Sequence, residues 1–335
     1  MRQPNFWYFD EPNLLAKLLY PLGIIFSLLG RISRLFVKPW KAPVPVICVG
    51  NLVVGGAGKT PTAIAIATVL KSRGWEPHFL TRGYGGTTTK PLLVNIQDHS
   101  SDIVGDEALL LAEISPTWVS SNRTKSAKLA IKSGANILIL DDGFQNEGIQ
   151  KDLSILVIDG EVGFGNKHLL PAGPLRENIA KGLKRSNAAL ILGNDKKMIA
   201  DHILKHTGKE FPILDGSIEP RDVKPEFFEK KFVAFCGIGR PKKFFDTLDK
   251  IGLDIISTFA FDDHHPYSRE ELIKLSTYAK RHGAELITTS KDRRRINANI
   301  NLAINELPIY IKWRKTSELD KFLDYLEGVS VDTKT

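Results

Sequence analysis

Cys48–Thr62 reads CVGNLVVGGAGKTPT, an apolar run that breaks into glycines and closes on Gly-Lys-Thr. The preceding Val46–Val49 favours a buried strand, and Thr62–Leu70 favours a helix whose N-terminal end would face the loop. Glycines let backbone N–H groups turn inward, and a helix N-terminus attracts anions. The order of strand, glycine loop and helix therefore predicts a phosphate-binding P-loop. Its expected nucleotide contacts are Gly55, Gly56, Ala57, Gly58, Lys59 and Thr60.

One position departs from the general P-loop pattern G-x-x-x-x-G-K-[ST], because Val53 stands where the first glycine is expected. Gly55 and Gly56 can supply the turn instead. In this interpretation Lys59 reaches the β- and γ-phosphates and Thr60 binds Mg²⁺. The alternative is an ordinary strand, turn and helix with a capping glycine, but the order of all four features favours the P-loop.

The composition is that of a folded protein with anionic partners. Of 335 residues, 42% are hydrophobic and 25% are charged, and the length accommodates two domains. The net charge of +8 favours nucleotides, acidic lipids or phosphorylated substrates. No RNA-binding motif is present, so we expect no nucleic-acid partner, and we expect no obligate protein partner. Cys48 and Cys236 lie far apart, which argues against a disulfide framework and fits a reducing cytoplasm.

The N-terminal segment Leu14–Leu29 is strongly apolar but is interrupted by Lys17 and Pro21. A membrane-spanning helix needs about 20 apolar residues, and no signal-peptide cleavage site follows. The segment is either a helix lying in the membrane interface or a core helix under the nucleotide domain. Apolar bulk beside a basic flank favours the membrane surface for residues 1–41. The flanking basic residues are Arg31, Arg34, Lys38 and Lys41.

Residues 42–222 alternate short apolar runs with amphipathic stretches such as Glu107–Ile114 and Thr124–Ser133. This alternation is typical of a P-loop NTPase-type α/β fold, with a largely parallel sheet and helices on both faces. The expected strands are Val46–Val49, Pro77–Thr81, Leu92–Ile96, Thr117–Ser120, Ile137–Leu140, Leu153–Ile158 and Ala188–Leu192.

Residues 223–327 predict a smaller α/β domain that closes over the site. Ile213–Phe228, with prolines at 220 and 225, is the expected linker. Pro308–Trp313 is a late strand that could join either domain, and residues 328–335 are an expected loose tail. The expected elements of this domain are strands at Phe232–Cys236, Asp254–Phe261 and Ala284–Thr289 and helices at Pro241–Ile251 and Arg269–His282.

Two carboxylates follow the apolar strand in Asn136–Gln145, which reads NILILDDGFQ. In a P-loop protein a carboxylate at such a strand end holds Mg²⁺, so Asp141 or Asp142 is the expected partner of Thr60. Asp-Asp-Gly is also favourable turn chemistry, which is the alternative. The P-loop upstream favours metal binding.

Two further sites could hold the acceptor chemistry. Asp106 opens a helix, where an aspartate is most often an N-cap, but a kinase also needs a carboxylate that deprotonates the acceptor hydroxyl. Both interpretations remain open. Asp262-Asp263-His264-His265 is a weak metal signal, because neighbours on an extended chain point in opposite directions. A carboxylate and histidine cluster that faces the first domain is the preferred interpretation.

The segment Gly163–Glu177 reads GFGNKHLLPAGPLRE, a long loop of the kind that is usually functional or disordered. Its leucines argue against disorder. Arg176 could stabilise phosphoryl charge and Glu177 could assist a metal, whereas the alternative is a surface ion pair.

These motifs, together with TRGYGG, CGIGRPKKFF and FDDHHPY, occur in an order that resembles the tetraacyldisaccharide 4′-kinase family of lipid A biosynthesis, over roughly residues 12 to 315. The resemblance implies ATP-dependent phosphorylation of the 4′-hydroxyl of an acylated glucosamine disaccharide 1-phosphate, which gives lipid IVA. It also implies work at the cytoplasmic face of a bacterial inner membrane. The Val53 departure matches the pattern of the family.

The resemblance assigns roles to individual residues. It implies that Asp106 is the catalytic aspartate, with Asp263-His264 completing a base–histidine dyad. Ser290 stands where the family often has an acidic residue, and no role follows for Lys291. The remaining family positions fall on Lys59 and Thr60 in the P-loop, Asp141, Asp142 and Glu177 at the metal, Gln145 at the nucleotide, and Arg176 and Arg123 at phosphate charge.

The rival hypothesis is a membrane-associated nucleotide switch or assembly ATPase, which would share the P-loop and the Mg²⁺ carboxylate. The guanine signature N-K-x-D is absent from the sequence. A switch that activates water also has little use for a lipid-facing helix beside an Asp–His pair. The lipid kinase is therefore the favoured prediction.

Overall fold

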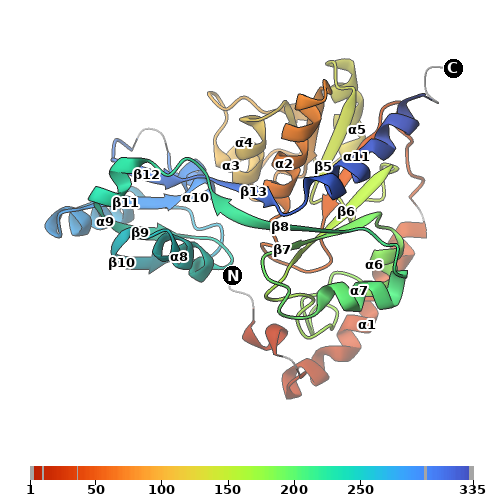
Figure 1. Cartoon of the computed structure of the whole chain (residues 1–335), viewed down its shortest axis with the longest axis horizontal. Helices are drawn as coiled ribbons and strands as arrows, with labels where there is room; N and C mark the ends of the chain where they lie inside the picture. Colours follow the sequence, from red (N-terminus) through yellow and green to blue (C-terminus); the bar gives the residue numbers. More distant parts are fainter. Residues whose placement is uncertain (1–3, 10, 36, 298–299, 332–335) are drawn as a thin grey trace.

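The computed structural model describes residues 4–9, 11–35, 37–297 and 300–331. These residues form two α/β domains and a long N-terminal helix (Figure 1). The first domain contains a nine-stranded sheet and the second a four-stranded sheet.

The first sheet is parallel except at its two edges, where β13 pairs antiparallel with β8 and β3 antiparallel with β4. Central β1 lies between β6 and β5 and is fully buried, as its apolar sequence predicts. In order across the sheet, the strands are β13 (Ile309–Trp313), β8 (Ile213–Pro220), β7 (Ala188–Leu192), β6 (Leu153–Asp159), β1 (Val46–Gly50), β5 (Ile137–Asp141), β2 (Pro77–Thr81), β4 (Thr117–Val119) and β3 (Leu92–Leu93).

Helices cover both faces of this sheet, which confirms the predicted architecture (Figure 1). Small and aliphatic side chains such as Ala67 and Leu323 pack on one face, and Ala127 and Leu183 on the other. The first face carries α2 (Lys59–Ser72), α4 (Asp106–Ala112) with the short α3 (Ser101–Val104) before it, and α11 (Thr316–Val331). The second carries α5 (Arg123–Lys132), α6 (Ile179–Lys184) and α7 (Ile199–Thr207).

The second sheet is wholly parallel and is also covered on both faces. Phe244 of α8 packs on one face, and Leu272 of α9 packs on the other. In sheet order the strands are β10 (Asp254–Ala260), β9 (Lys231–Cys236), β11 (Ala284–Thr289) and β12 (Ile304–Leu307). The helices are η2 (Pro225–Glu229), α8 (Pro241–Lys250), α9 (Arg269–Arg281) and α10 (Ser290–Arg295).

The predicted linker at residues 213–228 is wrong over its first half, because β8 occupies residues 213–220. Pro220 is tolerated there since it is the last paired residue of the strand, opposite Ile309. The second domain also ends earlier than residue 327. The chain returns to the first sheet as β13, and α11 buries Leu319 and Leu326 against its core.

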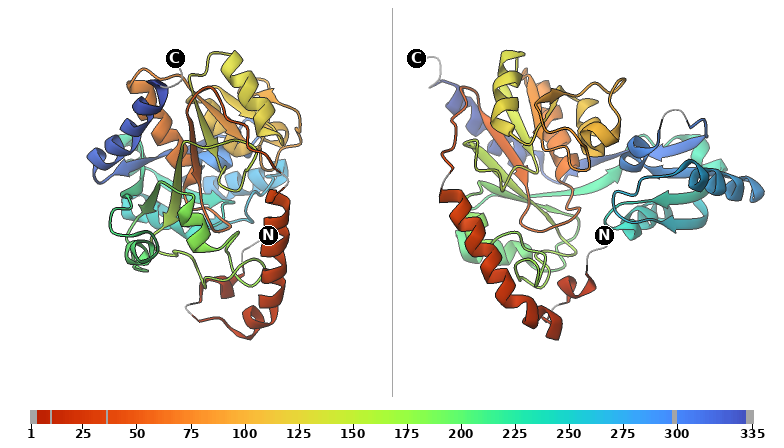
Figure 2. Two further views of the ribbon diagram at one scale, coloured as in Figure 1. Left: turned by 90° about the vertical axis from the view of Figure 1, so that its right-hand side faces the viewer. Right: turned by 180° about the vertical axis from the view of Figure 1, so that it is seen from behind.

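A helix at the apolar N-terminus is confirmed, and α1 (Leu14–Leu35) runs further than the predicted segment. Figure 2 shows α1 along the outside of the first domain, away from the second domain, with η1 (Asn5–Tyr8) beside its start. Ala16 is buried, whereas Leu14, Leu18 and Leu22 are half or more exposed. Within the described residues, no helix combines the length and apolar character needed to cross a bilayer. The side chains of Arg31 and Arg34 lie outside what is described, as do residues 332–335 of the expected tail.

Candidate active site

The glycine loop joins β1 to α2 as the sequence predicts. Gly58 has φ +88°, and a Cβ there would lie 2.5 Å from Leu192 Cδ1, so only glycine fits without strain. Lys59 begins α2, and its Nζ donates a 3.3 Å hydrogen bond to the carbonyl of Gly55. A Cβ on Gly56 would meet open space. The loop therefore leaves open space beside Gly56, where Lys59 and backbone N–H groups can bind an anion.

Asp141 lies beside the loop because β5 pairs with β1, with Val49 opposite Asp141. Thr60 Oγ1 donates a 3.1 Å hydrogen bond to Asp141 Oδ2. Asp141 Oδ1 is buried and has no hydrogen-bond partner among the described residues. Burial and the nearby Glu107 and Asp142 carboxylates raise the pKa of Asp141 to about 7. A buried hydroxyl–carboxylate pair with an unused oxygen fits a magnesium ion, which prefers oxygen ligands.

The Asp142 side chain interacts with different groups from those that contact Asp141. Arg176 Nη1 donates to both oxygens of Asp142, at 2.9 and 3.1 Å, and to Gln145 Oε1 at 3.1 Å. Lys59 Nζ lies 3.9 Å from Asp142 Oδ1. Burial opposes ionisation, but Lys59 and Arg176 outweigh it and hold the pKa of Asp142 below its usual value. The carboxylate of Asp142 therefore lies between Lys59 of the P-loop and Arg176 and interacts with both.

Arg123 and Glu177 also lie at this edge of the sheet. Arg123 is buried and donates to the carbonyls of Asp141 and Asp142, at 3.4 and 3.3 Å. Glu177 accepts from Arg185 Nη2 at 2.5 Å and from Gln145 Nε2 at 3.2 Å. Among the described residues, no three His, Cys, Asp or Glu side chains form a metal centre. Glu177 is thus held by Arg185 and Gln145.

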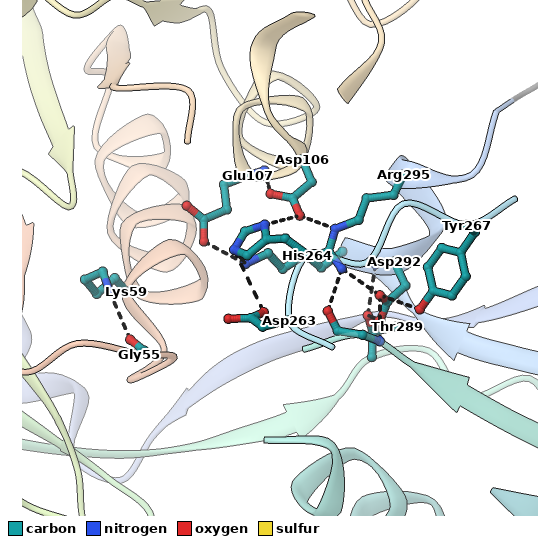
Figure 3. A network of polar contacts seen from close by, with 12 residues as sticks. Gly55, Lys59, Asp106, Glu107, Asp263, His264, Tyr267, Thr289, Asp292 and Arg295 are labelled. Atoms are coloured by element: carbon teal, nitrogen blue, oxygen red, sulfur yellow. Dashed lines mark hydrogen bonds and ion pairs between the residues drawn. The ribbon is translucent and has the colours of Figure 1, made fainter. Parts of the chain in front are cut away.

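Asp106 and His264 meet across the two domains (Figure 3). Asp106 begins α4 after Gly105, whose φ of +86° places it against the carbonyl of Tyr84. The N-cap of α4 is Gly105, so Asp106 is the first helical residue, and its Oδ1 accepts from the adjacent Glu107 N–H at 2.7 Å. His264 Nδ1 lies 3.2 Å from Asp106 Oδ2, and Asp263 Oδ1 lies 3.9 Å from His264 Nε2. The N-cap alternative is therefore wrong for Asp106.

Two basic side chains of α10 contact the adjacent carboxylates of Asp106 and Glu107. Arg295 Nε donates to Asp106 Oδ2 at 2.5 Å, and Lys291 Nζ donates to Glu107 Oε1 at 2.9 Å. Burial alone would raise the pKa of Asp106, but Lys291, His264 and Arg295 together hold it well below its usual value. Asp106 is consequently an ionised, hydrogen-bonded carboxylate.

A second contact brings α8 against the glycine loop. Arg240 Nη2 donates to the Gly56 carbonyl at 3.1 Å and pairs with Asp159 at 2.8 Å. Lys243 pairs with the same Asp159, which ends β6. The second domain therefore contacts the P-loop itself as well as Asp106.

Sequence reasoning missed several of these groups. The sequence predicted no role for Arg240, although its motif CGIGRPKKFF contributes to the family resemblance. It predicted none for Asp159, which ends an ordinary strand. Lys291 and Arg295 stand in a run of charged residues, SKDRRR, that is typical of a solvated surface. Their spacing of four residues places both on one helix face, which is the available signal.

A cavity of about 790 Å³ lies between α1 and this edge of the first domain. Phe26, Val37 and Leu170 supply apolar lining, whereas Arg123, Gln145 and Arg176 supply polar lining. The cavity is therefore amphipathic, with its polar groups drawn from the site that holds Asp142.

This fold and site define a P-loop phosphotransferase, in which a second domain adds an Asp–His pair and basic groups to the nucleotide loop. The model of the tetraacyldisaccharide-1-P 4′-kinase family matches residues 15–327. The chain therefore belongs to that family, which confirms the resemblance noted above.

Individual relatives agree. The chain is 47% identical over 301 residues to the tetraacyldisaccharide 4′-kinase of Parvibaculum lavamentivorans, covering 89% of this chain and 87% of the relative. It is 44% identical to the protein of that name from Paramagnetospirillum magneticum, covering 97% and 98%. It also superposes on a crystal structure of Aquifex aeolicus LpxK in complex with ATP, with a TM-score of 0.74, 26% identity and coverage of 93% and 99%.

Proposed function

We propose that this protein transfers the γ-phosphoryl group of ATP to the 4′-hydroxyl of a tetraacylated disaccharide 1-phosphate, giving lipid IVA. The observation that carries this proposal is the Asp106–His264 pair, which two domains assemble beside a P-loop (Figure 3). A hydrolytic switch needs an activated water, whereas a kinase needs a base for an incoming hydroxyl.

The nucleotide would lie on residues 55–60, with Lys59 directed at the β- and γ-phosphates and Gln145 supporting Arg176. The Aquifex relative forms a complex with ATP, which supports ATP as the nucleotide. Thr60 and Asp141 are the best-placed ligands for Mg²⁺, which would neutralise charge on the phosphates when bound. Asp142 and Glu177 are further candidate ligands, and each of them pairs with an arginine.

Asp106 is our proposed proton acceptor. Its Oδ2 is occupied by Arg295 and His264, while Oδ1 accepts, among the described residues, a single hydrogen bond from a backbone N–H. The remaining lone pair on Oδ1 would take the proton of the sugar hydroxyl as that oxygen attacks phosphorus. Arg176 and Arg123 would offset negative charge on the substrate phosphates.

The lipid would enter through the amphipathic cavity under α1. Phe26 and Leu170 would contact acyl chains, while Arg123 and Arg176 face the polar end. The exposed leucines of α1 would lie in the membrane interface at the cytoplasmic face of the inner membrane. Such an arrangement lets the enzyme take a lipid from the bilayer surface without a spanning helix.

Radiolabelled ATP and Mg²⁺, incubated with the disaccharide 1-phosphate in detergent, test the proposal directly. We expect label in the lipid with wild-type protein and a loss of about 100-fold or more with Lys59→Ala or Asp106→Asn. ATP hydrolysis without lipid labelling would favour the assembly ATPase instead. Full activity of Asp106→Asn would contradict the assigned base.

A further inference from the structure

Helix α10 of the second domain directs two cations at the acidic start of α4 in the first. Lys291 and Arg295 are four residues apart, so they share one face of the helix. Asp106 and Glu107 are adjacent on the opposing helix. Two cations, the carboxylates of Asp106 and Glu107, and the more distant carboxylate of Asp263 thus surround His264 (Figure 3).

Arg295 is held more rigidly than a surface arginine would be. Its side chain is 5% exposed, and Nη1 donates to the Gly237 carbonyl at 2.6 Å and to Asp292 Oδ1 at 2.9 Å. Asp292 also accepts from Tyr267 Oη at 2.9 Å. Because these bonds anchor the guanidinium, its Nε fixes the Asp106 carboxylate in one orientation.

Lys291 contacts His264, the second member of the Asp106–His264 pair. Its Nζ lies 3.4 Å from His264 Nε2 while it donates to Glu107 at 2.9 Å. An ammonium group can only donate, so Lys291 favours an accepting, unprotonated Nε2, whereas the Asp263 carboxylate 3.9 Å from the same nitrogen is the opposing group. In the form that Lys291 favours, His264 carries its proton on Nδ1, which is the nitrogen 3.2 Å from Asp106.

We propose that Lys291 and Arg295 are positioning residues for phosphoryl transfer, with Arg295 orienting the Asp106 carboxylate and Lys291 selecting the Nδ1–H tautomer of His264. This inference rests on the proposed role of Asp106 and His264. It follows that the base has its working geometry only when the second domain is docked on α4, because both cations arrive on α10.

Steady-state kinetics of Lys291→Met and Arg295→Gln provide the first test, with Arg294→Gln as the matched control. Arg294 pairs with Glu113 and Glu306 and therefore also links α10 to α4, but it does not contact Asp106 or His264. We expect kcat to fall about 10- to 100-fold in both test variants, with KM for ATP and lipid within about twofold. Lys291→Arg should recover part of the loss.

Equal losses in Arg294→Gln would overturn the inference, since they would show that domain docking alone matters. Unchanged kcat in Lys291→Met would also overturn it. Thermal unfolding of each purified variant identifies any that fail to fold, and Glu107→Gln, which weakens the anchor of Lys291, then provides an independent variant. Its kcat should fall in the same direction.

A double-variant cycle separates this inference from the proposed function. If Lys291 acts through His264, adding Lys291→Met to His264→Ala should cause no further loss of kcat. Multiplicative losses would overturn the inference and leave the dyad intact. Full activity of His264→Ala alone would instead contradict the dyad. Nitrogen-15 spectra of labelled histidine should show the Nδ1–H form of His264 in wild type and a mixture in Lys291→Met.

Discussion

Arg240 of the second domain donates a 3.1 Å hydrogen bond to the carbonyl of Gly56 in the P-loop of the first. This bond places a permanent cation beside the phosphate site and ties domain docking to the nucleotide loop. We expect Arg240→Ala to raise KM for ATP about 3- to 10-fold, because one charge-assisted hydrogen bond is lost. Lys242→Ala is the control, since Lys242 on the same helix is exposed and pairs only locally with Asp246. Identical KM values for the two variants would contradict this role.

Two glycines of the loop should respond oppositely to alanine. Gly58→Ala should lower the free energy of unfolding by about 1–3 kcal/mol, because φ is +88° and the new Cβ would meet Leu192 Cδ1 at 2.5 Å. Gly56→Ala should leave stability within about 0.5 kcal/mol, since its Cβ would face open space. It should nevertheless weaken ATP binding if the proposed phosphate site is the open space beside Gly56, which the methyl group would enter. Urea unfolding and nucleotide titration measure the two effects separately.

Asp159 should make part of the stability depend on acid pH. Burial would raise the pKa of Asp159, but Arg240 and Lys243 outweigh it and hold the pKa below its usual value. The stabilisation is therefore fully present above the unfolded pKa of about 4 and is lost as pH falls through the lower folded pKa. Asp159→Asn should cost about 1–3 kcal/mol at pH 7.

Urea unfolding of wild type and Asp159→Asn between pH 7 and pH 3 measures this loss. The difference in unfolding free energy should be constant near neutrality and should shrink as pH falls below 4. A difference that stays constant to pH 3 would show that Asp159 contributes by packing and not by charge.

The exposed face of α1 should determine membrane binding. Leu18 and Leu22 are 67% and 50% exposed, so their replacement by glutamate should leave the fold intact. Each buried leucine contributes about 1.5–3 kcal/mol, and the double variant should bind anionic vesicles at least about tenfold more weakly. Sedimentation with vesicles measures binding. Leu129→Glu, at a 39% exposed position on α5, is the control and should sediment like wild type.

Sequence reasoning succeeded where the chemistry is contiguous. Strand, glycines, Lys59 and Thr60 follow one another along the chain, so their order alone predicts the loop and its ligand class. The position of Asp141 at the edge of the sheet near the loop could be predicted for the same reason. Strand β5 ends in Asp141, and parallel strands end at the same edge of a sheet. The helix at the apolar N-terminus could also be predicted, because its signal lies in consecutive residues.

Errors arose where pairing partners are distant in the chain. Prolines at 220 and 225 suggested a linker, but residues 216–220 pair with a strand about 90 residues later, which no local pattern records. The same return of the chain placed β13 and α11 in the first domain. Most strands were therefore predictable from local pattern, whereas β8, β12 and the sheet to which β13 belongs were not.

Short ordered motifs were enough to predict that this chain binds a nucleotide phosphate and resembles lipid kinases, because those properties depend on residues that follow one another in the chain. Only the folded chain shows what contacts Asp106, which local reasoning left between an N-cap and a base. Its surroundings come from α10 and from the loop at His264, 158 to 189 residues further along the chain. Charge interactions depend on distance in space, so Lys291 and Arg295 acquire a role only when the two domains meet.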